Sequence, residues 1–317
     1  MKQPALQSKY QPGNATVDYA SRHTLNDTDD YNSLGYFTKN QWEFWRHNGY
    51  LVLKNIAPQE NIHNLVETLW DFEEKDPNSP DTWYAPPRRE IQMKELTNSG
   101  MVELYNHQAL WNNRQLAEIH RAFSDIWGTE KLWVTIDRAN LNFPVRDDHH
   151  FPGFIHWDID TSLSPRQHNV QGVLALSDTG ENTGGFQCIP ELFRDFDTWV
   201  SGQPADRDPF QPDISGYSIT PVNVQAGDLL IFNSMLPHGI RPNHSDRPRM
   251  AQYIAMTPAL EDNEELRQWR IKSWKERLAP EGYAFPGDPR GWEQKKHKTA
   301  ELTELGEKLL GLKKWKM

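Results

Sequence analysis

Three common protein classes are excluded by what the sequence lacks. Cys188 is the only cysteine among 317 residues, so the chain has neither an internal disulfide framework nor a cysteine-rich zinc site. No apolar run reaches the ~18 residues of a membrane-spanning helix. Residues 1–10 lack the apolar segment of a signal peptide. We therefore expect a cytoplasmic protein that does not bind a membrane.

Positive charge is also scarce. The chain has 34 lysines and arginines against 44 aspartates and glutamates, which gives a net charge of −10. A general nucleic-acid binder needs a basic surface to neutralise phosphates, so we expect no nucleic-acid partner. Lysines gather only within residues 295–316, in a pattern typical of a solvated helix face. The expected partner is a small-molecule substrate, and the sequence does not set the oligomeric state.

Composition divides the chain into three parts. Residues 1–36 are a polar N-terminal arm without periodicity. Residues 37–260 hold helical segments followed by a run of short strands separated by turns, and residues 261–317 return to helical periodicity. We expect this last part to pack on the same domain as a C-terminal helical extension. Helices first and strands afterwards predict a mainly β fold with flanking helices, either a sandwich or a barrel.

The start of the second part has clear local signals. Thr38 and Gln41 form a capping box that predicts a helix start, and Gly49 predicts its end. The apolar run Tyr50–Leu53 then predicts a short buried strand. After Pro58, apolar residues recur at helical spacing, which predicts an amphipathic helix.

The segment Phe154–Asp160 carries the strongest chemical signal. We predict a β-strand here, and side chains two residues apart in a strand point to the same face. His156 and Asp158 would then project together, while Trp157 points to the other side, either into the core or as a platform for substrate. His238 follows the apolar run 229–237, where we expect it at the end of a strand, before a turn at Gly239.

Two imidazoles and one carboxylate can hold Fe(II) on one face and leave other coordination positions open. His156, Asp158 and His238 supply this set. Other residues compete for the same role: Asp160 shares the predicted face of Asp158, and His149 and His150 lie in the preceding loop.

Arginines near the predicted site have separate possible roles. Arg249 borders the next apolar strand, where its planar, permanently charged fork could bind a carboxylate of a dicarboxylic co-substrate. Arg247 is its rival, but it precedes Pro248 in a loop. Arg241 either faces the site or pairs with an acid. Arg88, in the irregular stretch before residue 100, is a candidate contact for an anionic substrate.

These residues and the blocks around them resemble the phytanoyl-CoA dioxygenase family of Fe(II)- and 2-oxoglutarate-dependent oxygenases. The matching blocks, in chain order, are Phe37 to Leu53, His156-Trp157-Asp158, Val173 to Asp178, Asn182 to Phe186, Ala226 to Phe232, His238-Gly239, Pro242-Asn243 and Arg249. The resemblance implies a double-stranded β-helix, a cupin-like jelly roll, for residues 37–260. It also implies that His156, Asp158 and His238 bind iron, that Arg249 binds the C5 carboxylate of 2-oxoglutarate, and that Asn142 lies near the co-substrate.

The resemblance further implies that the enzyme uses Fe(II), 2-oxoglutarate and O₂ and releases succinate and CO₂ while it hydroxylates or desaturates a small metabolite. Halogenases of this type have a small residue where Asp158 stands, so halogenation is not expected. Two alternatives stay open. One is a non-catalytic jelly-roll module that binds metal and 2-oxoglutarate, and the other is a hydrolase or isomerase on a related barrel. Pro190–Phe193 departs from the family's pattern.

Overall fold

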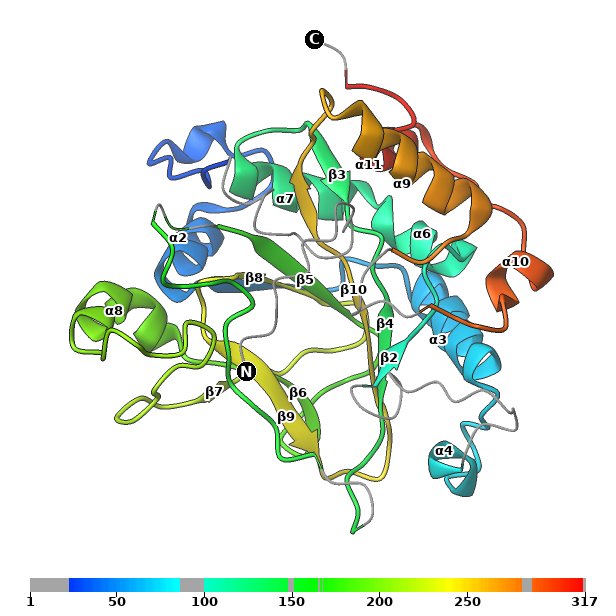
Figure 1. Cartoon of the computed structure of the whole chain (residues 1–317), viewed down its shortest axis with the longest axis horizontal. Coiled ribbons are helices and arrows are strands. Elements are labelled where there is room, and N and C mark those ends of the chain that lie inside the picture. Colours follow the sequence, from blue (N-terminus) through cyan, green and yellow to red (C-terminus); the bar gives the residue numbers. More distant parts are fainter. Residues whose placement is uncertain are drawn as a thin grey trace.

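Three antiparallel sheets form the centre of the computed structural model, which describes residues 23–85, 100–147, 151–164, 166, 168–280 and 287–315 (Figure 1). The strands are β1 (Tyr50–Leu53), β2 (Met101–Val102), β3 (Leu132–Val134), β4 (Ala139–Asn142), β5 (Val170–Ala175), β6 (Thr183–Cys188), β7 (Thr220–Pro221), β8 (Leu229–Asn233), β9 (His238–Asn243), β10 (Arg249–Tyr253) and β11 (Met256–Pro258). The large sheet has the order β1-β8-β5-β10-β4-β2, the second sheet the order β7-β6-β9, and β11 pairs with β3. The six-stranded and three-stranded sheets with flanking helices form the jelly roll that the family resemblance implied.

Helices surround these sheets. They are α2 (Lys39–Asn48), α3 (Gln59–Glu73), α4 (Asp81–Tyr84), α6 (Gln108–Arg114), α7 (Ala117–Trp127), α8 (Pro190–Ser201), α9 (Glu264–Glu276), α10 (Trp292–Lys296) and α11 (Glu304–Leu310). Figure 1 shows α3, α6 and α7 on one side of the large sheet and the small sheet with β6 and β9 on the other. None of the helices in the described ranges combines the length and apolar character needed to cross a membrane.

The large sheet is buried on both faces, because its central strands contribute side chains to two cores. In β8, Leu229 and Ile231 belong to the core under the helices, whereas Leu230 and Phe232 belong to the core between the sheets. This alternation follows from the two-residue period of a strand. The core between the sheets also contains Phe186 of β6, so the small sheet closes over the large one. The space between the sheets is where a ligand can be enclosed.

The predicted helix start at Thr38 is confirmed. Its side chain accepts a hydrogen bond from the Gln41 N–H, the Gln41 side chain accepts one from the Thr38 N–H, and Gly49 ends α2 in the left-handed conformation. The preceding residues are attached as well. The Asp125 carboxylate in α7 accepts hydrogen bonds from the backbone N–H groups of residues 35–37 at 2.7–2.9 Å.

The C-terminal helices pack against the same body. Arg270 of α9 donates hydrogen bonds to main-chain oxygens of Leu309, Leu310 and Val134 at 2.7–3.0 Å. Glu293 of α10 accepts the N–H groups of residues 105 and 106. The contacts with Val134 and with residues 105 and 106 join residues 261–317 to the preceding part of the chain through hydrogen bonds between buried side chains and the main chain.

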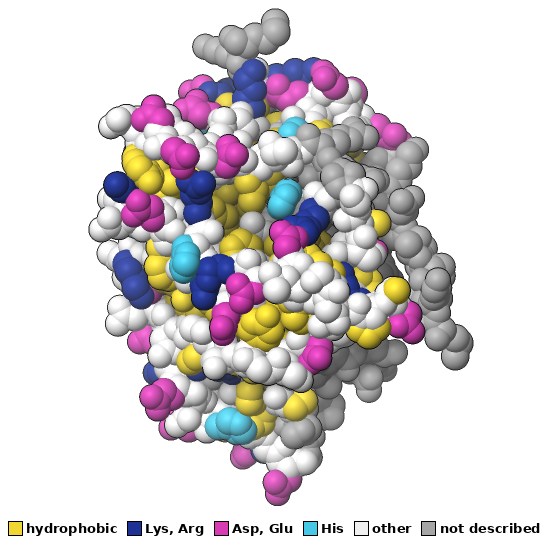
Figure 2. Space-filling view, turned by 90° about the vertical axis from the view of Figure 1, so that its left-hand side faces the viewer, with side chains coloured by type: hydrophobic (Ala, Val, Ile, Leu, Met, Phe, Trp, Pro, Cys, Tyr) yellow, Lys and Arg dark blue, Asp and Glu magenta, His cyan; other side chains and the backbone are white. Residues whose placement is uncertain are grey.

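On the face shown in Figure 2, Lys and Arg side chains are interspersed with Asp and Glu side chains, and hydrophobic side chains show between them. No continuous basic area is visible among the described residues of that face. This distribution differs from the one-signed surface of a protein that binds phosphate backbones.

Candidate active site

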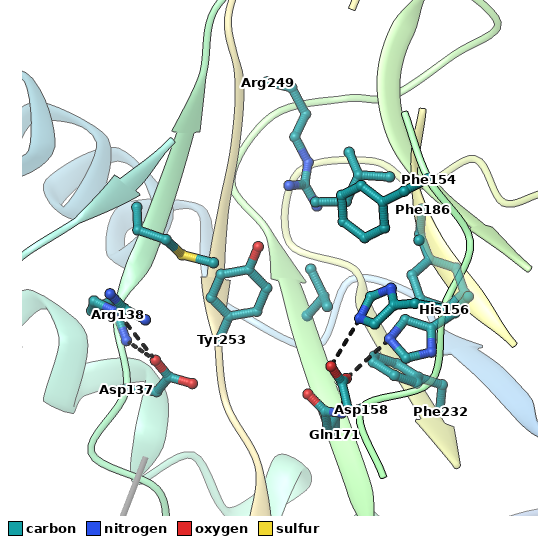
Figure 3. A pocket seen from close by; sticks show the side chains of 15 residues that line it. Asp137, Arg138, Phe154, His156, Asp158, Gln171, Phe186, Phe232, Arg249 and Tyr253 are labelled. Carbon is teal, nitrogen blue, oxygen red and sulfur yellow. Dashed lines mark hydrogen bonds and ion pairs between the residues drawn. The ribbon is translucent and has the colours of Figure 1, made fainter. Parts of the chain in front are cut away.

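His156, Asp158 and His238, called the triad from here on, meet at one end of the space between the sheets (Figure 3). One ligand atom from each residue lies within 4.8 Å of the other two. His156 Nε2 is 2.9 Å from Asp158 Oδ1, and His238 Nε2 is 3.1 Å from Asp158 Oδ2. No other group of this kind was found in the part of the chain that the structure describes.

The environment of His238 shows that the triad fits a metal cation. Its Nδ1 lies 2.9 Å from the main-chain oxygen of Leu236, which can only accept, so Nδ1 carries the proton. In the neutral ring, Nε2 then presents a lone pair to an Asp158 carboxylate oxygen. Two acceptors that face each other at this distance repel unless a cation or a proton lies between them. A divalent metal ion satisfies both, and imidazole with carboxylate is a donor set that iron accepts.

Close backbone approach brings the two parts of the triad together. The N–H and the C=O of His156 exchange hydrogen bonds with those of His238 at 2.8 and 3.0 Å. Gly239 makes this possible, because a Cβ at this position would lie only 1.7 Å from the main-chain oxygen of Phe154. The predicted strand over residues 154–160 was wrong, since only His156 forms a bridge. His238 also begins β9 rather than ending a strand, and Gly239 lies within β9.

Aromatic side chains hold the second imidazole in place. The His238 ring stacks on Phe186 of β6 with a centroid distance of 5.6 Å and an interplanar angle of 11°. Phe232 of β8 contacts it from another side, with a centroid distance of 4.4 Å. His238 is 5% exposed. The sheets therefore fix the orientation of this ligand before any metal binds.

Asp158 is held as a carboxylate. Burial works to raise its pKa, but the neighbouring imidazoles of His238 and His156 outweigh that effect and hold the pKa well below its usual range. Gln171 of β5 donates a further hydrogen bond to Oδ2 at 2.6 Å. Gln171 was not identified from the sequence, because the residues around it give no sign that it reaches Asp158.

Arg249 lies on the same cavity as the triad. This cavity has a volume of about 240 Å³ and is lined by all three triad residues, by Arg249 and by Tyr253. Arg249 is 4% exposed, and its Nη1 donates to Asn140 Oδ1 at 3.2 Å. Tyr253, four residues along β10, faces the same side. Burial raises the pKa of its phenol, while the charge and a hydrogen bond of Arg249 act in the opposite direction. A buried, fixed guanidinium of this kind suits a carboxylate ligand.

Two other predicted positions lie beside the cavity rather than on it. Asn142 pairs with Arg249 in the β4–β10 ladder, but it is Asn140 whose side chain bonds Arg249. Arg241 donates to Asn223 Oδ1 at 3.1 Å and does not line the cavity. Burial, followed by repulsion from Arg249, lowers the pKa of Arg241.

Trp157 is a core residue, which is the first of the two places that the sequence left open for it. It is 1% exposed, and its indole N–H donates to the Met235 oxygen at 2.9 Å. Its ring packs edge-on against Phe196 and Trp199 of α8. The departure from the family's pattern at Pro190 is the start of this helix, which supports the segment carrying His156 and Asp158 from behind.

The structure gives the positions of two of the alternative residues that the sequence offered. The Asp160 carboxylate accepts hydrogen bonds from the Ser162 N–H and hydroxyl and does not line the cavity, and Arg247 is exposed. Arg88, His149 and His150 lie outside the described residues.

Comparisons with known proteins agree with the site. The family model of phytanoyl-CoA dioxygenase matches residues 45–251. A Dictyostelium discoideum protein named for phytanoyl-CoA dioxygenase is 23% identical over 292 residues, covering 76% of this chain and 83% of that protein. The 2-aminoethylphosphonate dioxygenase of the uncultured bacterium HF130_AEPn_1 is 24% identical over 267 residues, covering 80% of this chain and 94% of that enzyme.

Among solved structures, GlcNAc Inducible Gene 2 from Candida albicans superposes with a TM-score of 0.63 at 13% identity, covering 89% of this chain and 78% of that one. This similarity shows the shared fold. The family model covers well over half of the sequence, and the structure brings together the residues through which the sequence resembles that family. The chain therefore belongs to the phytanoyl-CoA dioxygenase family, whose enzymes are oxygenases that use Fe(II), 2-oxoglutarate and O₂.

Proposed function

We propose that this chain hydroxylates or desaturates a small metabolite, with His156, Asp158 and His238 as the iron ligands and Arg249 as the partner of the 2-oxoglutarate C5 carboxylate. The observation that carries the proposal is the pair of acceptors, His238 Nε2 and an Asp158 oxygen, that face each other at 3.1 Å at the end of a cavity lined by a buried arginine. Bound iron supplies the redox chemistry that couples decarboxylation of 2-oxoglutarate by O₂ to oxidation of a substrate C–H bond.

The protein's own residues bind the metal and the co-substrate, orient the co-substrate and enclose the site. The triad would hold the metal from one side and would leave the cavity side open to the co-substrate. Arg249 fixes the far carboxylate of the co-substrate, which sets the position of its other end relative to the triad. The phenylalanines around His238 keep water from that side of the site.

The overall balance limits the products. Hydroxylation converts a C–H bond, O₂ and 2-oxoglutarate into a C–OH group, succinate and CO₂. Desaturation removes two hydrogens from the substrate and releases one water in place of the hydroxyl. Halogenation would need a halide at the coordination position that the Asp158 carboxylate fills, so we exclude it from the proposal.

The cavity size favours a small substrate. Its volume of about 240 Å³ lies below the roughly 300–1,000 Å³ typical of pockets for drug-sized ligands, and the co-substrate takes part of it. The two curated relatives described above are dioxygenases by name, and one of them is named for a small aminoalkyl phosphonate. Both observations support a small-molecule substrate for this chain.

The test is succinate release by the purified protein with a panel of small metabolites. We expect release to require Fe(II), O₂ and 2-oxoglutarate together, and the His156→Ala protein to release none. Arg249→Ala should lose 2-oxoglutarate binding, whereas Arg247→Ala, a matched change at an exposed arginine two residues away, should keep it. A protein that binds metal and 2-oxoglutarate but never releases succinate would be a non-catalytic module. Tight zinc binding that 2-oxoglutarate does not affect would favour a hydrolase or isomerase.

A further inference from the structure

Asp137 and Arg138 line the cavity at the end away from the triad. They directly precede β4, on the side of the large sheet where Met101 of β2 also reaches the cavity. In Figure 3 they lie on the other side of Tyr253 from the triad. Neither residue was identified from the sequence. A substrate held between this end and the triad would contact them.

The Asp137 carboxylate has one oxygen in use and one that faces the cavity. Oδ1 accepts a hydrogen bond from the Arg138 N–H at 2.7 Å and lies 3.6 Å from Arg138 Nε. For Oδ2, no hydrogen-bond donor is found among the residues that the structure describes. Figure 3 shows this second oxygen directed into the pocket, away from Arg138. The Asp137 side chain is 21% exposed.

The Arg138 guanidinium is the nearest positive charge to the Asp137 carboxylate, at 3.6 Å, but it is shared with a second carboxylate. The Arg138 guanidinium makes its close ion pair with Glu103, with Nη1 2.8 Å from Oε1. Arg114 approaches from the buried side, but it donates to the main-chain oxygens of Asp137 and Tyr105, not to the Asp137 carboxylate. Two carboxylates, Glu103 and Asp137, therefore share the single guanidinium of Arg138 at this end of the cavity.

Desolvation makes this carboxylate receptive to a cation. Burial raises the pKa of Asp137, although Arg138 and Arg114 act in the opposite direction. Water hydrates a partly buried carboxylate poorly. A cationic donor that forms a charge-assisted hydrogen bond with the unused oxygen therefore stabilises the carboxylate. An anionic group would meet the Asp137 carboxylate as a like charge, while Arg138, which also lines this end, is held in its close ion pair with Glu103.

We propose that Asp137 is the residue that selects the substrate, and that it does so by binding a protonated amine through Oδ2. This inference rests on the proposed oxygenase function and names the substrate class for the same site. The amine would be anchored beside β4, and the carbon to be oxidised would lie between Asp137 and the triad. Tyr253 separates this substrate end from Arg249, where the co-substrate carboxylate binds.

The experiment uses three matched panels of small compounds: primary alkylamines, the alcohols in which a hydroxyl replaces the amine, and the corresponding carboxylates. Binding is measured anaerobically to the full-length protein loaded with Ni(II) and 2-oxoglutarate, and succinate release is measured with Fe(II) and O₂. We expect amines to bind and to stimulate succinate release, and the alcohols and carboxylates to do neither.

Variants of Asp137 then test the residue itself. Asp137→Asn keeps an oxygen for the Arg138 N–H, so the fold is preserved. Loss of one charged hydrogen bond should raise the dissociation constant of the amine by about 10- to 100-fold. The dissociation constants of Ni(II) and 2-oxoglutarate should stay within about twofold. Asp137→Glu should recover part of the amine affinity, and Asp262→Asn, at an exposed acid outside the cavity, should change nothing.

The outcomes separate this inference from the proposed function. Preference for alcohols or carboxylates, amine binding unchanged in Asp137→Asn, or no response to any amine while Ni(II) and 2-oxoglutarate bind, would each overturn the role of Asp137. Failure of the wild-type protein to bind 2-oxoglutarate would instead overturn the oxygenase proposal.

Discussion

Ionisable side chains gather in two regions of the molecule that differ in how their hydrogen-bonding groups are satisfied. In the C-terminal cluster, defined as Arg114, Arg270 and Glu293, the side chains bond to main-chain groups. Arg270 donates to three carbonyl oxygens, Arg114 to two, and Glu293 accepts two N–H groups. In the triad, His238 Nε2 and an Asp158 oxygen face each other as acceptors beside an open cavity.

The difference that matters lies in the hydrogen-bond partners. Each side chain of the C-terminal cluster finds main-chain partners within the fold and ties distant segments together, so its removal should cost stability. The triad is unsatisfied without a cation, so its removal should cost activity. Burial of histidines, carboxylates or arginines does not by itself mark a site; hydrogen-bonding groups that the fold leaves facing one another do.

The largest effect should come from His156→Ala. We expect succinate release to fall below detection, because two remaining ligands do not hold the metal in the required geometry. The melting temperature of the metal-free protein should change by only a few degrees, as His156 is partly exposed and ties no segments together through its side chain. Activity and thermal unfolding measured on the same preparation check both halves. If this variant unfolded, the triad would contribute to stability in the same way as the C-terminal cluster, which would contradict the comparison.

Arg270→Met should have the reverse effect. Its three carbonyl partners would be left buried without a donor, and we expect unfolding to become easier by roughly 3 kcal/mol. Urea unfolding at neutral pH measures this loss, and succinate release per folded molecule should stay the same. Arg121→Met, at an exposed arginine with a surface ion pair, serves as control and should change stability by less than about 0.5 kcal/mol. Equal effects of the two changes would remove the distinction between the regions.

Arg249→Lys should weaken 2-oxoglutarate binding by about tenfold or more. Lysine keeps the charge but loses the planar fork that grips both carboxylate oxygens. Anaerobic titration of the Ni(II)-loaded protein gives the dissociation constant, with Arg247→Lys as the matched control. Unchanged affinity in Arg249→Lys would mean that the co-substrate carboxylate binds elsewhere.

The smallest effect concerns pH and lies next to the C-terminal cluster. Burial, then repulsion from His297, lowers the pKa of His107 from 6.5 to about 4. Its Nδ1 caps α6 by accepting the Ala109 N–H. Between pH 6.5 and 4 the unfolded state binds the proton more tightly, so this contribution to stability is full above pH 6.5 and is lost as the pH falls toward 4.

His107→Asn keeps an N-cap but does not titrate. The loss of unfolding free energy between pH 7 and pH 5 should therefore be smaller in the variant, by about 1 kcal/mol after allowance for solvent screening. Urea titrations at the two pH values measure it. The same slope in both proteins would show that His107 carries no such effect.

The secondary-structure elements that could be predicted from the sequence are those whose signals are local. The capping box at Thr38 and the helix starting after Asn263 are of this kind, because each depends on neighbours within one turn. The three metal ligands were identified from their residue types and their spacing along the chain. The secondary structure predicted around the site was wrong, because a short alternating run does not reveal that only His156 pairs with another strand.

The other residues of the cavity could not be identified from the sequence, because their positions depend on the register between strands that are distant in the chain. Gln171, Tyr253 and Asp137 share the cavity only because β4, β5 and β10 lie side by side in a particular alignment. No spacing along the chain encodes that alignment. Helix α8 was missed although a signal existed: Leu192, Phe196 and Trp199 recur at helical spacing and are buried.

Anaerobic equilibrium dialysis against Fe(II) is the measurement that tests the central claim most directly. If the facing acceptors of the triad are a metal site, the wild-type protein binds one Fe(II) per chain, and Asp158→Ala and His238→Ala bind none at the same free concentration while remaining folded. Wild-type protein that binds no Fe(II), or variants that bind it as tightly as the wild type, would contradict the account.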